Sequence, residues 1–150
     1  MTAQALHHAA TTVTDMEASL HFYRDVMGFK VVDDDVLEGP DISNMVGLPD
    51  VKLRAVMLSA ADDVPFLELI EYLRPRSREL RSQASASDIG TAHFCFLVES
   101  IHDEYERLTG LGIRFNAPPF VAEGGRFDGE WAAYCFDPDG LIVELWSRGP

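Results

Sequence analysis

The sequence predicts an α+β protein made of two βαβββ modules, because one pattern occurs in it twice. The stretch ALHHAATTVTDMEASLHFYRDVMGF begins at Ala5, and TAHFCFLVESIHDEYERLTGLGI begins at Thr91. Each has a His on a short apolar run, a segment with helical spacing that ends on a Gly, and three further apolar runs behind it. A shared period over roughly sixty residues indicates an internal duplication.

In the first module, residues 4–13 predict a strand, and Thr14 or Asp15 is the expected cap of a helix that Gly28 ends. Apolar runs separated by turn residues predict three more strands, at residues 29–37, 51–60 and 64–73.

The second module repeats this order. Residues 91–99 predict a strand, and Ser100 caps a helix that ends near Gly112. Three strands are expected to follow, with the turn DPDG between the last two, at residues 113–120, 129–137 and 141–147. A polar segment without an apolar run, residues 74–90, predicts a linker. We therefore expect a single domain, residues 1–150, with modules at about 1–73 and 91–150.

Composition narrows the classes of partner and compartment. Twelve basic residues against twenty-five acidic ones give a net charge of −13, which argues against nucleic acid and anionic membranes as partners. Cys95 and Cys135 form no spaced metal or redox motif, so we expect buried thiols in a reducing compartment. The N-terminus has no basic segment followed by an apolar one, and a cytoplasmic protein is the expectation.

Strand periodicity places one His and one Glu of each module among apolar neighbours. His8 lies on the first strand and Glu68 on the last strand of the first module; His93 and Glu144 occupy the matching places in the second. A lone His or Glu on such a strand is usually a core or surface residue. The repeated pair points to a ligand set, because two nitrogens and two oxygens suit a divalent first-row metal if the modules are related by a pseudo-twofold axis.

Four stretches carry a family resemblance, namely HHAATTVTDMEASLHFYRDVMGF, FLELIEY, AHFCFLVESIHDEYERL and FDPDGLIVEL. With them the sequence resembles the vicinal oxygen chelate superfamily, which includes glyoxalase I, methylmalonyl-CoA epimerase, extradiol dioxygenases and bleomycin-binding proteins. The resemblance implies paired βαβββ modules that form a cupped mixed sheet around a central site, and a homodimer. It also implies one divalent ion per site (Ni, Mn, Co, Zn or Fe(II)), with ligands at His8, Glu68, His93 and Glu144.

The same resemblance implies a reaction on a small-molecule substrate. Glu144 or Glu68 is the expected base of a glyoxalase I-type or epimerase-type isomerase or lyase, which transfers a proton next to a substrate oxygen held by the metal. An Fe(II) extradiol dioxygenase and a non-catalytic drug-binding protein are the alternatives. Thr12 stands where bacterial glyoxalase I has an Arg for glutathione.

The loops leave further alternatives open. The segment DDDVLEGPDISNMVGLPDVK is expected to fold over the cup. Arg126 and Glu130 lie in a Gly-rich loop, which is either a lid or an ordinary hairpin loop. Aromatic residues of the second module either line a pocket for a bulky apolar ligand or pack in the core; they are Phe120, Phe127, Trp131 and Tyr134.

Overall fold

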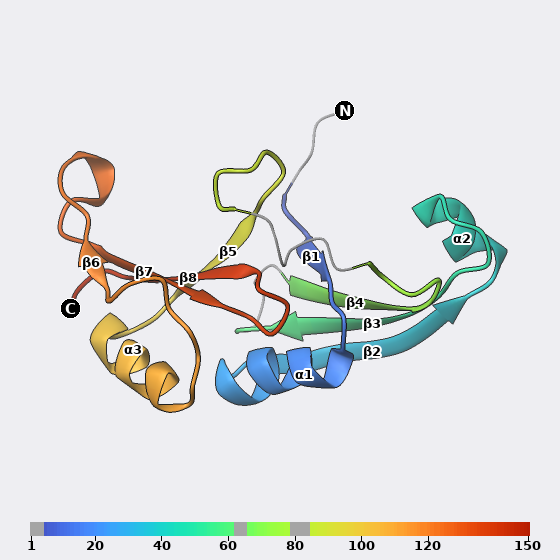
Figure 1. Ribbon diagram of the computed structural model, residues 1–150, viewed down its shortest axis with the longest axis horizontal. Helices are drawn as coiled ribbons and strands as arrows, with labels where there is room; N and C mark the ends of the chain where they lie inside the picture. Colours follow the sequence, from blue (N-terminus) through green and yellow to red (C-terminus); the bar gives the residue numbers. More distant parts are fainter. Residues whose placement is uncertain (1–4, 62–65, 79–84) are drawn as a thin grey trace. The chain divides into compact units, whose positions relative to one another are not determined.

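In the computed structural model, which describes residues 5–61, 66–78 and 85–150, the chain forms two compact units, residues 1–79 and 80–150 (Figure 1). The sheet of the first unit has the strand order β1–β4–β3–β2, with β1 parallel to β4 and the other pairs antiparallel. Its strands are β1 (His8–Thr12), β2 (Lys30–Glu38), β3 (Lys52–Ser59) and β4 (Phe66–Arg74). Its helices are α1 (Met16–Leu20), the π-helix η1 (His21–Val26) and α2 (Pro40–Val46).

The second unit repeats this topology with the strand order β5–β8–β7–β6. Its strands are β5 (His93–Leu97), β6 (Phe120–Val121), β7 (Trp131–Phe136) and β8 (Ile142–Ser147). Its helices are α3 (Ile101–Gly110) and the short 3-10 helix η3 (Gly125–Phe127). The α+β class and the two βαβββ modules are thus confirmed. No helix in the described part of the chain is long and apolar enough to span a membrane.

The first helix of each unit begins at a side-chain cap and is followed by a Gly. The side chain of Asp15 accepts a hydrogen bond from the backbone N–H of Ala18 at 3.0 Å, and that of Ser100 accepts one from Asp103 at 3.3 Å. These caps satisfy backbone donors that a helix N-terminus leaves free. Behind each helix stands a Gly with positive φ, +81° at Gly28 and +82° at Gly112, a conformation that other residues rarely adopt.

Each sheet buries one face under its helix and leaves the other face without a helix over its centre (Figure 1). Strand alternation explains this, since residues two apart point to the same side. Full burial of one large apolar side chain stabilises the fold by about 1.5–3 kcal/mol. The helix face of the first unit buries Met16, Leu20, Tyr23, Val56, Leu58, Leu67 and Leu69. The helix face of the second buries Ile101, Leu108, Ala133, Cys135, Val143 and Leu145.

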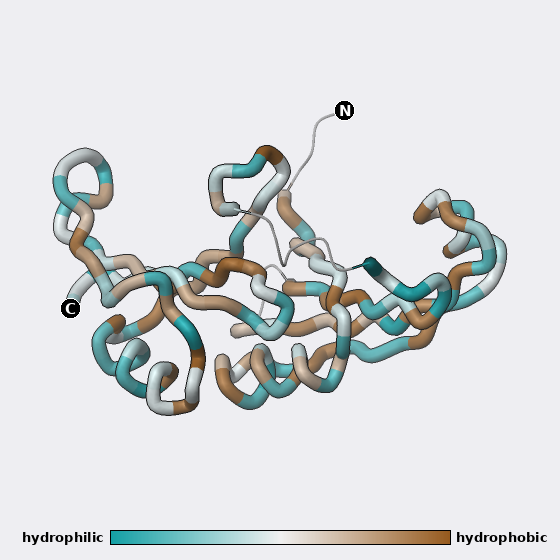
Figure 2. Tube along the Cα trace, viewed as in Figure 1, coloured by the Kyte–Doolittle hydropathy of each residue, from teal (hydrophilic) through white to brown (hydrophobic). Residues whose placement is uncertain are grey.

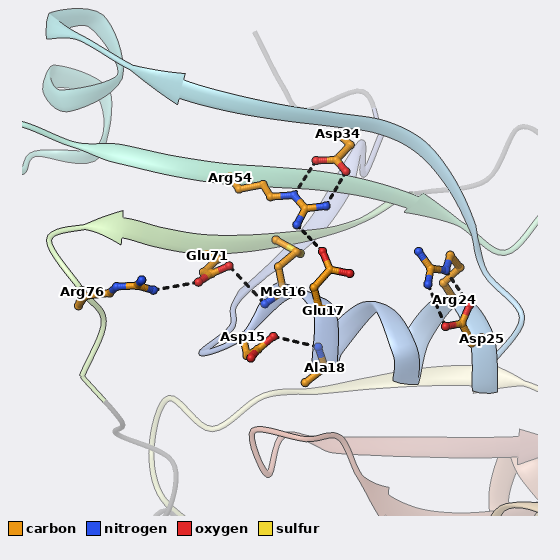
Figure 3. Close-up of polar contacts among 10 residues, drawn as sticks. All are labelled: Asp15, Met16, Glu17, Ala18, Arg24, Asp25, Asp34, Arg54, Glu71 and Arg76. Carbon is orange, nitrogen blue, oxygen red and sulfur yellow. Dashed lines mark hydrogen bonds and ion pairs between the residues drawn. The ribbon is translucent and has the colours of Figure 1, made fainter.

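Polar contacts fasten α1 to its sheet (Figure 3). Arg54 on β3 donates two hydrogen bonds to Asp34 on β2, at 2.8 and 2.7 Å, and one to Glu17 on α1 at 2.7 Å. Glu71 on β4 accepts the backbone N–H of Met16 at 3.3 Å and also pairs with Arg76 at 3.0 Å. Hydrophilic residues accordingly dominate the middle of the edge strand β2 (Figure 2).

Two connections differ from the prediction. The strand expected at residues 113–120 is wrong for most of its length, because Pro118 and Pro119 have no N–H for a ladder; only one bridge, Phe115 to Cys135, precedes β6. The connection between β2 and β3 contains the short helix α2, which buries none of its residues. It stands at the end of the β2–β3 hairpin (Figure 1).

The predicted linker is only partly described. Residues 79–84 lie outside the described residues. On their N-terminal side, residue 74 still belongs to β4. On their C-terminal side, the backbone N–H of Asp88 bonds to the carbonyl of Ser85 at 3.0 Å, and that of Thr91 to Asp88 at 3.0 Å, so this part of the segment is built of turns.

Candidate functional site

Each unit brings one predicted His and one predicted Glu into contact on the sheet face that its helix leaves open. His8 Nε2 lies 3.4 Å from Glu68 Oε2, and His93 Nε2 lies 3.0 Å from Glu144 Oε2. The register is the same in both sheets: Glu68 stands opposite residue 10 and Glu144 opposite residue 95, each two positions after the His. The two pairs are therefore equivalent by position. That all four side chains converge on one ion stays a prediction.

The separation within each pair fits two ligands of one small cation. Two donors that each lie about 2.1 Å from an ion are about 3.0 Å apart at a right angle and about 3.4 Å apart at the tetrahedral angle. The measured separations are 3.0 and 3.4 Å. In the part of the chain that the structure describes, no three His, Cys, Asp or Glu side chains gather closely enough to hold an ion. Each unit thus offers two ligands, fewer than structural or catalytic sites use.

A thiol and a phenol stand next to Glu144, and the thiol, Cys95, is exposed, so the predicted burial is wrong for Cys95 and confirmed for Cys135. Cys95 stands opposite Glu144 on β5, and Tyr134 stands opposite it on β7. Loss of hydration, with the charge of Glu144 second, raises the pKa of the Cys95 thiol to about 12. The same two causes raise the pKa of the Tyr134 hydroxyl. Both groups therefore stay protonated near neutral pH, and the Tyr134 ring packs 5.4 Å from the His93 ring, centroid to centroid.

Glu68 occupies in the first unit the position that Glu144 has in the second, and the residues opposite it on the adjacent strands carry no ionisable group. Glu68 stands opposite Ala10 on β1 and Met57 on β3. The neighbour that sequence reasoning missed is His7, whose Nδ1 lies 2.8 Å from Nδ1 of His8. Period-two alternation assigns His7 to the opposite face, but β1 begins only at His8, so alternation does not apply to His7. An imidazole that bonds the far nitrogen of a ligand His fixes that ligand's tautomer and ring orientation.

Not every carboxylate on β4 faces this pair. Glu71 lies on the helix face, where it accepts the N–H of Met16 at the start of α1 (Figure 3). Glu71 follows Glu68 by three positions, and an odd offset on a strand places two side chains on opposite faces. The structure therefore gives the two glutamates distinct surroundings, a candidate ligand and a helix anchor.

The aromatic residues of the second unit divide between the two faces. Trp131 packs against His102 of α3, with ring centroids 4.7 Å apart, so it belongs to the helix face. Tyr134 lies on the open face, and Phe120 and Phe127 are exposed. Glu130, to which the sequence assigned no role, accepts a hydrogen bond from the indole N–H of Trp146 on β8. No spacing in the sequence marks that contact, because its two residues are sixteen positions apart.

Comparisons with known proteins find relatives over most of this chain. The chain is 27% identical to a 2-epi-5-epi-valiolone epimerase of an Actinomyces species, over 95% of this chain and 79% of that protein. It is 26% identical to lactoylglutathione lyase of Schizosaccharomyces pombe over 99% of its own length, but it spans only 49% of that enzyme. Its fold is similar to that of a glyoxalase family protein from Bacillus cereus, with a TM-score of 0.86, 18% identity and coverage of 100% and 97%.

A family-wide match covers nearly the whole chain. The Glyoxalase/Bleomycin resistance protein/Dioxygenase superfamily matches residues 5–145, a range that includes both His–Glu pairs. The predicted family resemblance is confirmed: the chain belongs to the Glyoxalase/Bleomycin resistance protein/Dioxygenase superfamily.

Proposed function

We propose that the protein is a divalent-metal-dependent isomerase or lyase that moves a proton next to an oxygen of a small-molecule substrate. His8, Glu68, His93 and Glu144 are the proposed ligands of one ion. The observation that carries the proposal is the repeated His–Glu contact at identical register positions of two sheets. A duplicated pair of nitrogen and oxygen donors suits Mn, Fe, Co, Ni or Zn. The relatives named above, an epimerase and a lyase, support the reaction class.

A divalent ion, when bound, supplies a Lewis acid that stabilises negative charge developing on a substrate oxygen. Glu144 is the proposed base, which accepts the proton at a carboxylate oxygen and returns it to the neighbouring carbon. Its side chain is 12% exposed, against 20% for Glu68, so water competes less for it. The protonated Cys95 and Tyr134 beside it add no negative charge of their own.

The ion would be held either by the two units of one chain or by units of two chains in a homodimer. Mixing His8→Ala with His93→Ala decides between these arrangements. If units of two chains share a site, a mixed dimer contains one intact site and recovers part of the activity. If each chain builds its own site, both proteins remain inactive after mixing.

Exchange of a substrate hydrogen tests the reaction without knowledge of the natural substrate. The protein is loaded in turn with each candidate metal, and elemental mass spectrometry measures the ions retained. It is then incubated in D2O with a panel of 2-hydroxy ketones and hemithioacetals. Proton NMR should show deuterium entering the carbon next to the oxygen. Glu144→Gln should slow this exchange by about 10²–10⁴-fold while circular dichroism stays unchanged. Exchange that survives the substitution would remove Glu144 from its role.

The greater exposure of the Glu68 side chain, 20% against 12% for Glu144, favours one second candidate, an Fe(II) ring-cleaving dioxygenase. In that case two His and one carboxylate hold the iron, and Glu68 is a bystander. Oxygen uptake with catechols by the Fe(II)-loaded protein, unaffected by Glu68→Gln, would establish this reaction in place of proton transfer. Metal retention with neither reaction would point to a binding protein.

A further inference from the structure

We infer that the open face of the second unit receives an aromatic ring of the substrate beside the His93–Glu144 pair. The inference rests on the proposed function, because it places the ring on the same molecule whose oxygens face this pair. Four residues stand in one row across the sheet and are called here the Trp146 row: Leu97, Trp146, Ala132 and Phe120.

The Trp146 row lies directly beside the row that contains Glu144. Trp146 follows Glu144 by two residues on β8, and Leu97 follows Cys95 by two residues on β5. Residues two apart on a strand point to the same face and are about 7 Å apart. A group bonded to the carbon that bears the reacting oxygens would therefore reach this row.

A loop from the same unit completes the apolar surface. Phe127 of η3 packs edge-to-face on Trp146, with ring centroids 5.3 Å apart. Glu130 accepts the indole N–H, so Trp146 needs no polar partner from a ligand. Phe127 is 48% exposed and Leu97 63% exposed, which leaves apolar area for a flat group. Edge-to-face and offset-stacked contacts favour an aromatic ring over an aliphatic chain.

Backbone hydrogen bonds hold this loop in place. The N–H of Ala122 bonds to the carbonyl of Glu130 at 2.7 Å, and the N–H of Gly129 bonds to the carbonyl of Ala122 at 2.9 Å. At the loop tip, the side chain of Asp128 accepts the N–H of Gly124 at 2.6 Å. The segment forms a hairpin loop between β6 and β7, and these bonds place Phe127 beside Trp146.

The equivalent row of the first unit shows that the duplicated scaffold does not require large apolar side chains here. Its members, in the order that matches the Trp146 row, are Thr12, Ile70, Ala55 and Asp35. None is aromatic, and the row ends on a carboxylate where the second unit has Phe120. The aromatic character therefore belongs to the second unit alone.

Fluorescence of Trp146 tests the inference directly. Trp131→Phe leaves Trp146 as the single Trp of the chain, since the sequence has two. Mandelate and lactate bear the same hydroxyl and carboxylate on adjacent carbons and differ in a phenyl against a methyl group. With Zn²⁺ present, mandelate should shift the Trp146 emission and bind at least about tenfold more tightly than lactate. Phe127→Ala should reduce that ratio to below about threefold, whereas Ile70→Ala, at the position in the first unit that corresponds to Trp146, should leave it unchanged.

Benzyl alcohol, added without metal, distinguishes a failure of the proposed metal-dependent function from a failure of the aromatic subsite. If it shifts Trp146 emission while Zn²⁺ strengthens neither mandelate nor lactate, the metal-dependent function fails and the aromatic subsite stands. If Trp146 responds to no aromatic compound, or is shielded from acrylamide in the free protein, the row is covered by packing and the inference is wrong. Equal binding of mandelate and lactate, or a ratio that Phe127→Ala leaves intact, also overturns it.

Discussion

The two units share one scaffold but differ in the side chains around their His–Glu pairs. In both sheets the Glu stands opposite the second residue after the His, so each position of one unit has a counterpart in the other. The residues next to Glu68 are Ala10, Met57 and Ile70; their counterparts next to Glu144 are Cys95, Tyr134 and Trp146. Small or aliphatic groups surround Glu68, whereas a thiol and two aromatic side chains surround Glu144.

Because of this difference, we expect the two units to have different roles in the reaction. Both carboxylates are proposed ligands, but only Glu144 has a thiol and a hydroxyl that stay protonated opposite it. After a duplication, one copy can keep a binding role while the other acquires the groups that the chemistry needs. We therefore expect equal roles in metal binding and unequal roles in proton transfer.

The largest expected effect comes from exchanging the two carboxylates for amides one at a time. Glu144→Gln should lower turnover by about 10²–10⁴-fold, because an amide cannot accept the proton. Glu68→Gln should mainly weaken metal affinity, so that excess metal restores much of the rate. Steady-state rates across a metal titration measure both. Rescue of both variants by metal, or of neither, would show that the units are functionally equal.

A smaller effect is expected from Tyr134, the counterpart of Met57. Its ring supports the His93 imidazole at 5.4 Å, and residues that orient a ligand typically change metal affinity by about 10–100-fold when lost. Tyr134→Ala should therefore weaken Zn²⁺ binding by about tenfold in isothermal titration calorimetry. Tyr134→Phe keeps the ring and should stay within about threefold of the wild type. A loss as large for Phe as for Ala would assign the role to the hydroxyl instead.

The sequence predicted what strand periodicity and helix caps determine. The Ser100 cap and the strand faces that carry His8, Glu68, His93 and Glu144 follow from local spacing, because alternation and capping act within a few residues. Of the two predicted caps of the first helix, Thr14 and Asp15, the structure shows Asp15. Contacts across the sheet did not follow in the same way. The bond from Trp146 to Glu130 depends on the path of a loop, and no local pattern encodes that path.

Sequence patterns also failed to predict helix α2 and predicted too long a strand before β6, in each case for a physical reason. Helix α2 has only seven residues, too few for a sustained apolar period, although Ile42, Met45 and Val46 have helical spacing. Pro40 at its start and Gly47 at its end were also usable signals. The residues before β6 have the apolar composition of a strand, but two consecutive prolines remove the donors that pairing needs.

The helix caps offer a test in which the two units should behave alike. Asp15→Ala and Ser100→Ala each remove one side-chain acceptor at a helix N-terminus. Each should lower the free energy of unfolding by about 1 kcal/mol in urea denaturation. Asp15→Asn and Ser100→Asn keep an acceptor and should cost much less. A large effect in one unit and none in the other would show that the two helices contribute unequally to stability.

The smallest expected effect concerns the contact that fastens each helix to the third strand of its unit. In the first unit Arg54 pairs with Glu17 of α1; by register its counterpart is Trp131, which packs on His102, the counterpart of Glu17. Both contacts join the second residue of the helix to an equivalent strand position. An ion pair and an aromatic pair thus occupy the same place, and they should respond differently to salt and acid.

Arg54→Ala should lower the free energy of unfolding at pH 7 by about 0.5 kcal/mol, since exposed ion pairs contribute little. The Arg54 hydrogen bonds lower the pKa of Asp34, so this stabilisation is present above the ordinary Asp value of 3.8 and is lost as the pH falls through the lower folded value. Added salt should also reduce it. Urea unfolding at pH 7 and pH 3, each at low and high salt, measures both dependences.

Trp131→Leu is the matched variant: its cost should not vary with salt, because it removes an aromatic contact rather than a charge. A salt-independent cost for Arg54→Ala would mean that the packing of its alkyl chain, and not its charge, holds α1 against the sheet.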